Sequence, residues 1–278
     1  MPKAFIPAIS GQQSGAIAEA LRKAGWDVAG SSRTDRHDPR DAAAGARALV
    51  LTIPQDHRPG AMTGFVSYWV EAAQSRAIGR IVLNLGGTPG AADEHPFFAD
   101  LHAARNQVAQ SGLPFVVLQP TVYLDNLAAP WARDALAAGT IAYPAAPDAP
   151  VSWLSHRTLG AWVAAVADGR ADGQTLAVGG PEALTGAELA REIGRGTGKD
   201  LRYMPVAPSD FAQAMNAAMG EPAGDRLASI YERHAREPRS MKVDPALARN
   251  YGVELEDAAS FAARALVSGG GGGRPEMV

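Results

Sequence analysis

Short apolar runs alternate with helix-like segments through the first half of the chain. The apolar runs predict strands over residues 4–9, 27–32, 48–53, 80–85 and 115–119. Apolar residues at helical spacing predict a first helix that ends near Gly25 and two further helices, over 61–77 and 97–111. Apolar strands separated by helices are typical of a parallel sheet covered on both faces. The predicted fold class is therefore α/β, a doubly wound parallel sheet of the Rossmann type.

The second half of the chain is more mixed and predicts a small α+β C-terminal lobe. Thr185 and Glu188 form a capping-box pattern that opens a helix ending near Arg195. The other expected elements are helices over 123–138, 156–168, 208–219, 223–236 and 255–267, strands over 174–178 and 201–205, and a loop over 140–150. We expect a core over 1–155, a smaller substrate lobe interleaved with it over 156–267, and a flexible tail over 268–278.

Composition narrows the classes of protein. Hydrophobic residues make up 46% of the 278 residues and the formal net charge is −3, so a packed core is expected and binding along a phosphate backbone is not. There is no cysteine, which excludes disulfides and thiolate chemistry. Neither an apolar run long enough for a membrane span nor a signal-peptide pattern is present. We therefore expect a cytoplasmic protein whose partner is a small-molecule substrate, with a homodimer as an open alternative.

The turn after the first strand is the first candidate site. Ligands of open parallel sheets bind outside the carboxyl ends of the strands, and dinucleotide folds place glycines in this turn so that backbone N–H groups approach a pyrophosphate. The matching positions here are Ala8, Gly11 and Ser14, so one glycine of three is present. The expected cofactor-binding residues of the turn are Ser10, Gly11, Gln12, Gln13 and Ser14. An ordinary strand-to-helix turn without a ligand is the alternative.

Arg33 follows the second predicted strand, about 22 residues after Gly11. An acidic residue at this place binds the ribose 2′-hydroxyl, whereas an arginine suits a 2′-phosphate. Arg33 therefore predicts NADP(H) as the dinucleotide. At the ends of the third and fourth strands, Thr52, Pro54 and Gly86 are further candidate cofactor contacts.

Candidate groups for substrate chemistry follow the later strands. His95 and Tyr123 are the candidate catalytic residues, as weak acids near the strand ends. Asn126, three residues after Tyr123, is a candidate substrate contact, as are Trp153 and His156. Each also has a structural alternative: an exposed loop for His95, a turn-stabilising role for Tyr123 and Asn126, and core packing for Trp153.

The sequence lacks the residue patterns that several other kinds of chemistry require. The six histidines show no metal-ligand spacing, so no metal site is expected. The chain has no G-x-S-x-G elbow and no Walker-type phosphate loop. None of the six tyrosines has a lysine four residues later.

Several blocks together resemble one family. The stretch KAFIPAISGQQSGAIAEALRKAGWDVAGSSR, the strands ALVLTIP and RIVLNLGG, and the block VAQSGLPFVVLQPTVYLDNL resemble the NmrA-like atypical short-chain dehydrogenases/reductases. The segment LAVGGPEALTGAELAREIGRGTGKDLRYMPV continues the resemblance, which covers about residues 3–240. It implies a Rossmann core, a small C-terminal lobe and NADP(H) between them. The Tyr-x-x-x-Lys pair that short-chain dehydrogenases use is absent here, as are two glycines of the family's turn.

The leading hypothesis is an NADPH-dependent reductase of a quinone- or enone-like small molecule, because such acceptors stabilise negative charge themselves and need no strong acid. Two alternatives stay open. One is a regulatory protein that senses NADP(H) without turnover, and the other is a pathway enzyme that has kept the fold and lost the cofactor.

Overall fold

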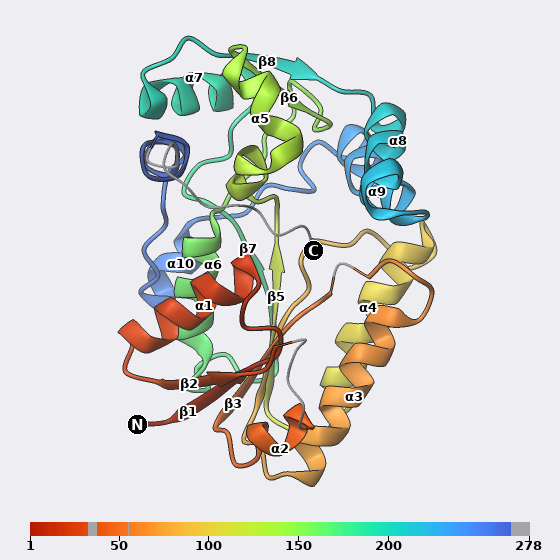
Figure 1. Cartoon of the computed structure of the whole chain (residues 1–278), viewed down its shortest axis with the longest axis vertical. Helices are drawn as coiled ribbons and strands as arrows, with labels where there is room; N and C mark the ends of the chain where they lie inside the picture. Colours follow the sequence, from red (N-terminus) through yellow and green to blue (C-terminus); the bar gives the residue numbers. More distant parts are fainter. Residues whose placement is uncertain (33–37, 55, 268–278) are drawn as a thin grey trace.

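A six-stranded parallel sheet forms the centre of the computed structural model, which describes residues 1–32, 38–54 and 56–267 (Figure 1). The strands lie in the order β2-β1-β3-β4-β5-β7, and every neighbouring pair is parallel. They are β1 (Lys3–Ile6), β2 (Asp27–Gly30), β3 (Ala48–Thr52), β4 (Ile81–Asn84), β5 (Phe115–Pro120) and β7 (Gln174–Val178). The predicted doubly wound α/β fold is confirmed, and the strand predicted over 174–178 is found residue for residue.

Helices cover both faces of the sheet (Figure 1). One face carries α1 (Gln12–Lys23) and α6 (His156–Val166), and the other carries α3 (Ala61–Ser75) and α4 (Pro96–Ala109). Side chains alternate along β1, so that Ala4 and Ile6 pack with α1 and α6, whereas Phe5 packs with α3 and α4. The apolar strands are thus buried on both sides.

The crossover from β2 to β3 is short, because β2 ends at Gly30 and β3 begins at Ala48. Its only described helix is α2 (Pro39–Ala43), which Asp38 caps by accepting a hydrogen bond from the Arg40 backbone N–H.

The helices α1 and α6, on the same face of the sheet, pack closely against each other. A Cβ at Gly160 of α6 would lie 2.6 Å from the Ala16 carbonyl oxygen, so glycine is required where these two helices meet.

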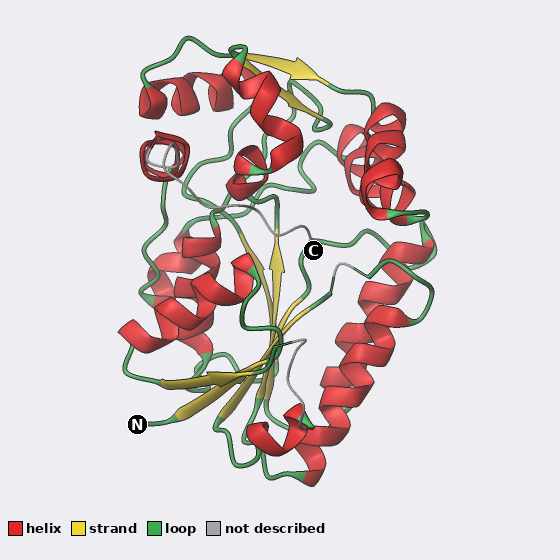
Figure 2. Cartoon of the chain, viewed as in Figure 1, coloured by secondary structure: helices red, strands yellow, loops and turns green. Residues whose placement is uncertain are grey.

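The smaller lobe lies beyond the carboxyl ends of the strands, as the upper part of Figure 2 shows. It holds a two-stranded parallel sheet and a third apolar core. Its elements are η1 (Leu124–Ala128), α5 (Pro130–Ala137), β6 (Thr140–Tyr143), α7 (Gly186–Thr197), β8 (Arg202–Pro205), α8 (Pro208–Met219), α9 (Ala223–Arg236), α11 (Ala258–Ala262) and η2 (Ala263–Val267), whereas α10 (Ala246–Tyr251) packs against α6 in the core. The predicted capping box is confirmed, because the Thr185 backbone N–H donates to Glu188 at 2.9 Å and the Glu188 N–H donates back to the Thr185 hydroxyl.

Two predictions for this half are wrong, and a third, the helix over 255–267, is found with a later start. The helix over 123–138 is split, because Pro130 has no N–H to donate and so begins a new helix after the 3₁₀ turn η1. The loop over 140–150 contains β6, which pairs with β8, whose residues lie 62 positions further along the chain, and so depends on a distant partner. The helix over 255–267 begins later, where Asp257 caps α11, and it continues as the π-helical turn η2.

The first strand is also shorter than predicted. It ends at Ile6, and the following residues form a turn in which the Ile9 N–H donates to the Ser31 carbonyl and the Gly11 N–H donates to the Ala8 carbonyl. The turn lies at the carboxyl edge of the sheet, where β1 meets β3 and the strand order reverses. This is the edge at which open α/β sheets bind ligands.

Candidate functional site

The turn between β1 and α1 has a left-handed residue and an uncapped helix N-terminus, although two of its three expected glycine positions carry other residues. Ala8 has φ +51°, a left-handed conformation that favours glycine. Gly11 is the N-cap of α1 and therefore brings no capping side chain, and the first turn of the helix holds no acidic residue. Ser10, Gly11 and Gln12 are exposed, whereas Ser14 is buried against the fold. The N–H groups at the start of α1 thus face outward, as an anion site requires.

The left-handed conformation of Ala8 should lower the stability of the protein, and a substitution can test this. Replacing Ala8 with glycine is expected to raise the free energy of unfolding by about 1 kcal/mol, because glycine adopts the left-handed conformation without a Cβ clash. Chemical denaturation of both proteins measures the difference. Ala16→Gly within α1 is the matched control and should destabilise the protein, by about 1 kcal/mol. An Ala8→Gly protein that is less stable than the parent would contradict the strained geometry of this turn.

Asn84, the last residue of β4, joins three parts of the site. It is fully buried, and its Nδ2 donates to Gln13 Oε1 at 3.0 Å. Its Oδ1 accepts from the Gly86 N–H at 3.0 Å and from the Tyr123 hydroxyl at 3.4 Å. Asn84 is not among the predicted site residues, although an asparagine that ends an otherwise apolar buried strand is a visible signal. The first turn of α1, the loop after β4 and the segment after β5 therefore meet at one amide.

Tyr123 and His156 lie together beside this amide. Their rings meet edge to face with centroids 4.8 Å apart, and both residues are buried. Burial raises the pKa of Tyr123, so its hydroxyl stays protonated. His156 begins α6, and its backbone N–H donates to Asp125 Oδ2 at 2.7 Å while its Nδ1 lies 3.4 Å from Asp125 Oδ1. Asp125 was not predicted as a site residue.

Asn126 and Trp153 contact a group of aromatic side chains in the smaller lobe. Asn126 Nδ2 donates to the Tyr143 hydroxyl at 2.8 Å, and that hydroxyl lies 2.9 Å from the hydroxyl of Tyr231. Trp153 is buried and packs edge to face on the Tyr143 ring at 5.0 Å. Burial raises the pKa of Tyr143 to about 12. This group is a neutral aromatic cluster at the end of the segment that carries Tyr123.

The remaining candidate cofactor residues lie at the same edge of the sheet. Thr52 ends β3 beside Asn84, and its hydroxyl is buried without a hydrogen-bond partner among the described residues. Pro54 is half-buried two residues later, and Gly86 has φ +70° in the loop after β4. Arg33 falls outside the described residues.

The structure places His95 at the start of α4. His95 caps α4, with its Nδ1 accepting from the Phe97 N–H at 3.1 Å. Burial and the Arg226 cation lower the pKa of His95. His102 contacts the Gly90 carbonyl at 2.8 Å through Nε2, which is a packing role.

A buried charged cluster ties the smaller lobe to the core near His95. Arg226 of α9 is buried, and its Nη2 lies 2.5 Å from Asp100 Oδ2 of α4. Its guanidinium also lies over the ring of Phe97, with 5.0 Å to the centroid. Burial, and then the Arg226 cation, lower the pKa of nearby His57 to about 4.

Within the described part of the chain, no group of three histidine, aspartate or glutamate side chains is placed to hold a metal ion. Among the same residues, every helix is too short or too polar to cross a membrane.

The chain matches the model of a known family and is similar to several known proteins. The model of the NmrA-like family matches residues 80–259, which is well over half of the chain. Prestalk A differentiation protein A of Dictyostelium discoideum is 25% identical over 70% of this chain and 62% of its own length. The NAD(P)H azoreductase of Xenophilus azovorans is 28% identical over 58% of this chain and 57% of its own length. The chain thus spans about three-fifths of these two curated relatives.

Solved structures share the fold across nearly the whole chain. The NADPH-dependent quinone oxidoreductase of Escherichia coli, complexed with NADPH, superposes with a TM-score of 0.70 at 20% identity, covering 94% of this chain and 98% of its own. NmrA, a negative transcriptional regulator in complex with NADP, superposes with a TM-score of 0.74 at 15% identity, covering 95% and 94%.

Proposed function

The chain belongs to the NmrA-like family, and on that basis we propose that it is an NADP(H)-dependent oxidoreductase that reduces a quinone- or enone-like small molecule by hydride transfer. The observation that carries the proposal is the hydrogen-bonded path from Gln13 through Asn84 to Tyr123. It connects the dinucleotide-type turn to the segment after β5. An NADPH-dependent quinone oxidoreductase and an NAD(P)H azoreductase among the similar proteins support the same reaction class.

The residues at the sheet edge fit NADP(H). The uncapped N-terminus of α1 suits the pyrophosphate, and the buried hydroxyl of Thr52, which has no hydrogen-bond partner within residues 1–32, 38–54 and 56–267, leaves one polar atom for a ligand. The residues that would hold the cofactor are Ser10, Gly11, Gln12, Gln13, Ser14, Arg33, Thr52, Pro54 and Gly86. When bound, NADPH supplies a hydride.

The protein's own residues position the reacting groups. Asn84 fixes Gln13 and the Gly86 backbone on one side and the Tyr123 hydroxyl on the other. Tyr123 donates a hydrogen bond and keeps its proton, because burial raises its pKa. The substrate-facing candidates are Asn126, Trp153 and His156. Since no tyrosine is followed four residues later by a lysine, simple ketones and alcohols should react poorly, and acceptors that delocalise negative charge should be preferred.

A regulatory protein that binds NADP(H) without turnover is the second candidate. The structural likeness to a transcriptional regulator in complex with NADP favours it, as do the substituted glycine positions at Ala8 and Ser14. Both candidates require cofactor binding and only the first requires NADPH oxidation. A cofactor-free enzyme on the same fold would require neither.

Arg33 gives a direct test of the cofactor. Arg33→Ala should weaken NADPH binding by about 1.5–3 kcal/mol and leave NADH binding nearly unchanged, because a charge-assisted contact to the 2′-phosphate exists only in NADPH. Fluorescence titration of each dinucleotide into both proteins measures the difference. Arg22→Ala, at the opposite end of α1 from the turn, is the matched control. Equal losses for the two dinucleotides would show that Arg33 does not contact the phosphate.

A further inference from the structure

We propose that His156 is the catalytic proton donor of this site, oriented by Asp125, and that Arg264 and Glu256 of the C-terminal segment are positioning residues for that pair. The inference rests on the proposed reductase function, because the proton is the one that a reduced acceptor requires. It adds to that function a named acid and a role for residues far from the dinucleotide turn.

Asp125 holds the imidazole in a defined orientation. One carboxylate oxygen accepts from the His156 backbone N–H at 2.7 Å, and the other lies 3.4 Å from His156 Nδ1. A carboxylate at Nδ1 favours the tautomer that carries its proton there, which leaves Nε2 to take up and deliver a proton. The ring of Tyr123, hydrogen-bonded to Asn84, contacts the same imidazole. His156 is therefore linked to the group of residues that meets the dinucleotide turn.

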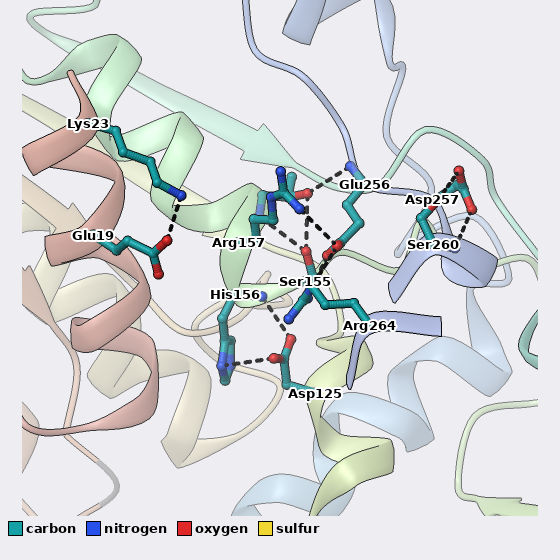
Figure 3. Close-up of polar contacts among 11 residues, drawn as sticks. Glu19, Lys23, Asp125, Ser155, His156, Arg157, Glu256, Asp257, Ser260 and Arg264 are labelled. Atoms are coloured by element: carbon teal, nitrogen blue, oxygen red, sulfur yellow. Dashed lines mark hydrogen bonds and ion pairs between the residues drawn. The ribbon is translucent and has the colours of Figure 1, made fainter. Parts of the chain in front are cut away.

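A second charged pair, Arg264 and Glu256, lies near the His156–Asp125 pair. Arg264 of η2 donates to Glu256 through Nε at 2.7 Å and through Nη2 at 2.8 Å, a bidentate contact. The Glu256 side chain is only 8% exposed, and its backbone N–H donates to the Thr158 hydroxyl of α6 at 3.1 Å. Figure 3 shows these groups gathered around the start of α6, with Arg264 reaching toward Asp125. The C-terminal segment thus carries a fixed cation to the His156–Asp125 pair.

The proton balance of the step is simple. The hydride brings the acceptor two electrons and one hydrogen, and the reduced acceptor becomes an anion. The protonated imidazole gives its Nε2 proton to this anion, which yields the neutral reduced product and neutral His156. Solvent then returns one proton to Nε2. Over the cycle, NADPH, one proton and the acceptor become NADP⁺ and the reduced acceptor.

The charges around His156 act in opposite directions. Burial lowers the pKa of His156, the Asp125 carboxylate raises it, and the Arg264 cation lowers it further. Arg264 itself interacts with Asp125, with Glu256 and with Glu19 of α1. Arg157, the next residue of α6, lies 3.7 Å from Glu256. Although burial opposes it, the contact with Arg264 holds the pKa of Glu256 below its usual value, so this residue is an anion that offsets part of the cation.

Two substitutions should therefore shift the pKa of His156 in opposite directions. Arg264→Gln removes a cation and should raise it, whereas Glu256→Gln leaves the Arg264 cation unbalanced and should lower it. Because the protonated imidazole is the acid, the rate of reduction falls as pH rises through this pKa. The falling limb of the kcat profile should move to higher pH in Arg264→Gln and to lower pH in Glu256→Gln. A loss of packing alone would not produce shifts of opposite sign.

The experiment is an NMR titration of the imidazole resonances of the full chain, with pH profiles of NADPH oxidation measured in parallel with a quinone. His156→Asn assigns the resonance and should lower kcat by between about 10²- and 10⁴-fold with NADPH affinity retained. Arg195→Gln is the matched control, since Arg195 also pairs with carboxylates but lies on α7, and it should move neither readout.

Each result decides a separate part of the proposal. Shifts of the same sign, or none, would overturn the roles of Arg264 and Glu256. Unchanged kcat in His156→Asn would remove His156 as the acid. If the parent protein binds NADPH but oxidises none with any acceptor, the proposed function fails and the catalytic role fails with it. The imidazole shifts would even then decide whether Arg264 and Glu256 act on His156.

Discussion

Replacing Asn84 with leucine is expected to lower kcat/KM for NADPH by about 30- to 100-fold. Leucine fills a similar volume but leaves the Gly86 N–H, the Gln13 side chain and the Tyr123 hydroxyl without their shared partner. Leaving a buried polar group unpaired costs about 1–3 kcal/mol, and each 1.36 kcal/mol is a factor of ten in rate. Steady-state kinetics with NADPH as the varied substrate measures the loss.

Two variants separate this effect from a general loss of structure. Tyr123→Phe removes only the 3.4 Å contact with Asn84 and should cost less than about tenfold. Thr52→Val removes a buried hydroxyl that has no partner among the described residues, so it should leave stability unchanged while weakening NADPH binding. An Asn84→Leu protein with unaltered kinetics would show that the path from Gln13 to Tyr123 has no part in function.

Replacing Arg226 with methionine should produce the largest loss of stability, about 3 kcal/mol of unfolding free energy. Arg226 is 5% exposed and joins α9 to Asp100 of α4, and removal of one partner from a buried ion pair leaves the other charge uncompensated. The Asp100 side chain is 25% exposed and can recruit water, which keeps the loss at the lower end of the range for buried pairs. Denaturant unfolding monitored by tryptophan fluorescence measures it.

The double variant Arg226→Met/Asp100→Leu should recover much of that loss, because two apolar side chains replace the pair without leaving a buried charge. Lys23→Met provides the surface control. Lys23 and Glu19 are 71% and 67% exposed, and breaking such a pair costs at most about 1 kcal/mol. A loss for Arg226→Met no larger than that of Lys23→Met would mean that the Arg226–Asp100 pair does not hold the smaller lobe to the core.

The parallel sheet could be predicted from the sequence because each of its strands is a local apolar run bounded by turn residues. The strand over 174–178 and the helices over 208–219 and 223–236 are found with the predicted bounds for the same reason. In contrast, β6 has a sequence that also suits a loop, and only its pairing with the distant β8 makes it a strand. Local pattern carries no information about such a partner.

The residues of the candidate site also fall into those that the sequence could predict and those that it could not. Tyr123 and His156 follow predicted strands or open predicted helices, and the structure brings them together at one edge of the sheet. Asn84, Asp125, Glu256 and Arg264 were not predicted, since their importance depends on which side chains they meet across the fold. His95 illustrates the converse, because its place after a strand suits a catalytic role and its hydrogen bond makes it a helix cap.

The most direct test of the proposed function is the oxidation of NADPH by the protein in the presence of a quinone, followed by the loss of nicotinamide absorbance. We predict that the protein oxidises NADPH faster than NADH at equal concentration and that oxidation depends on the quinone, because the proposed substrate is an acceptor that stabilises its own negative charge. No oxidation above the protein-free rate, with NADPH shown to be bound, would contradict the reductase assignment and favour a regulatory protein.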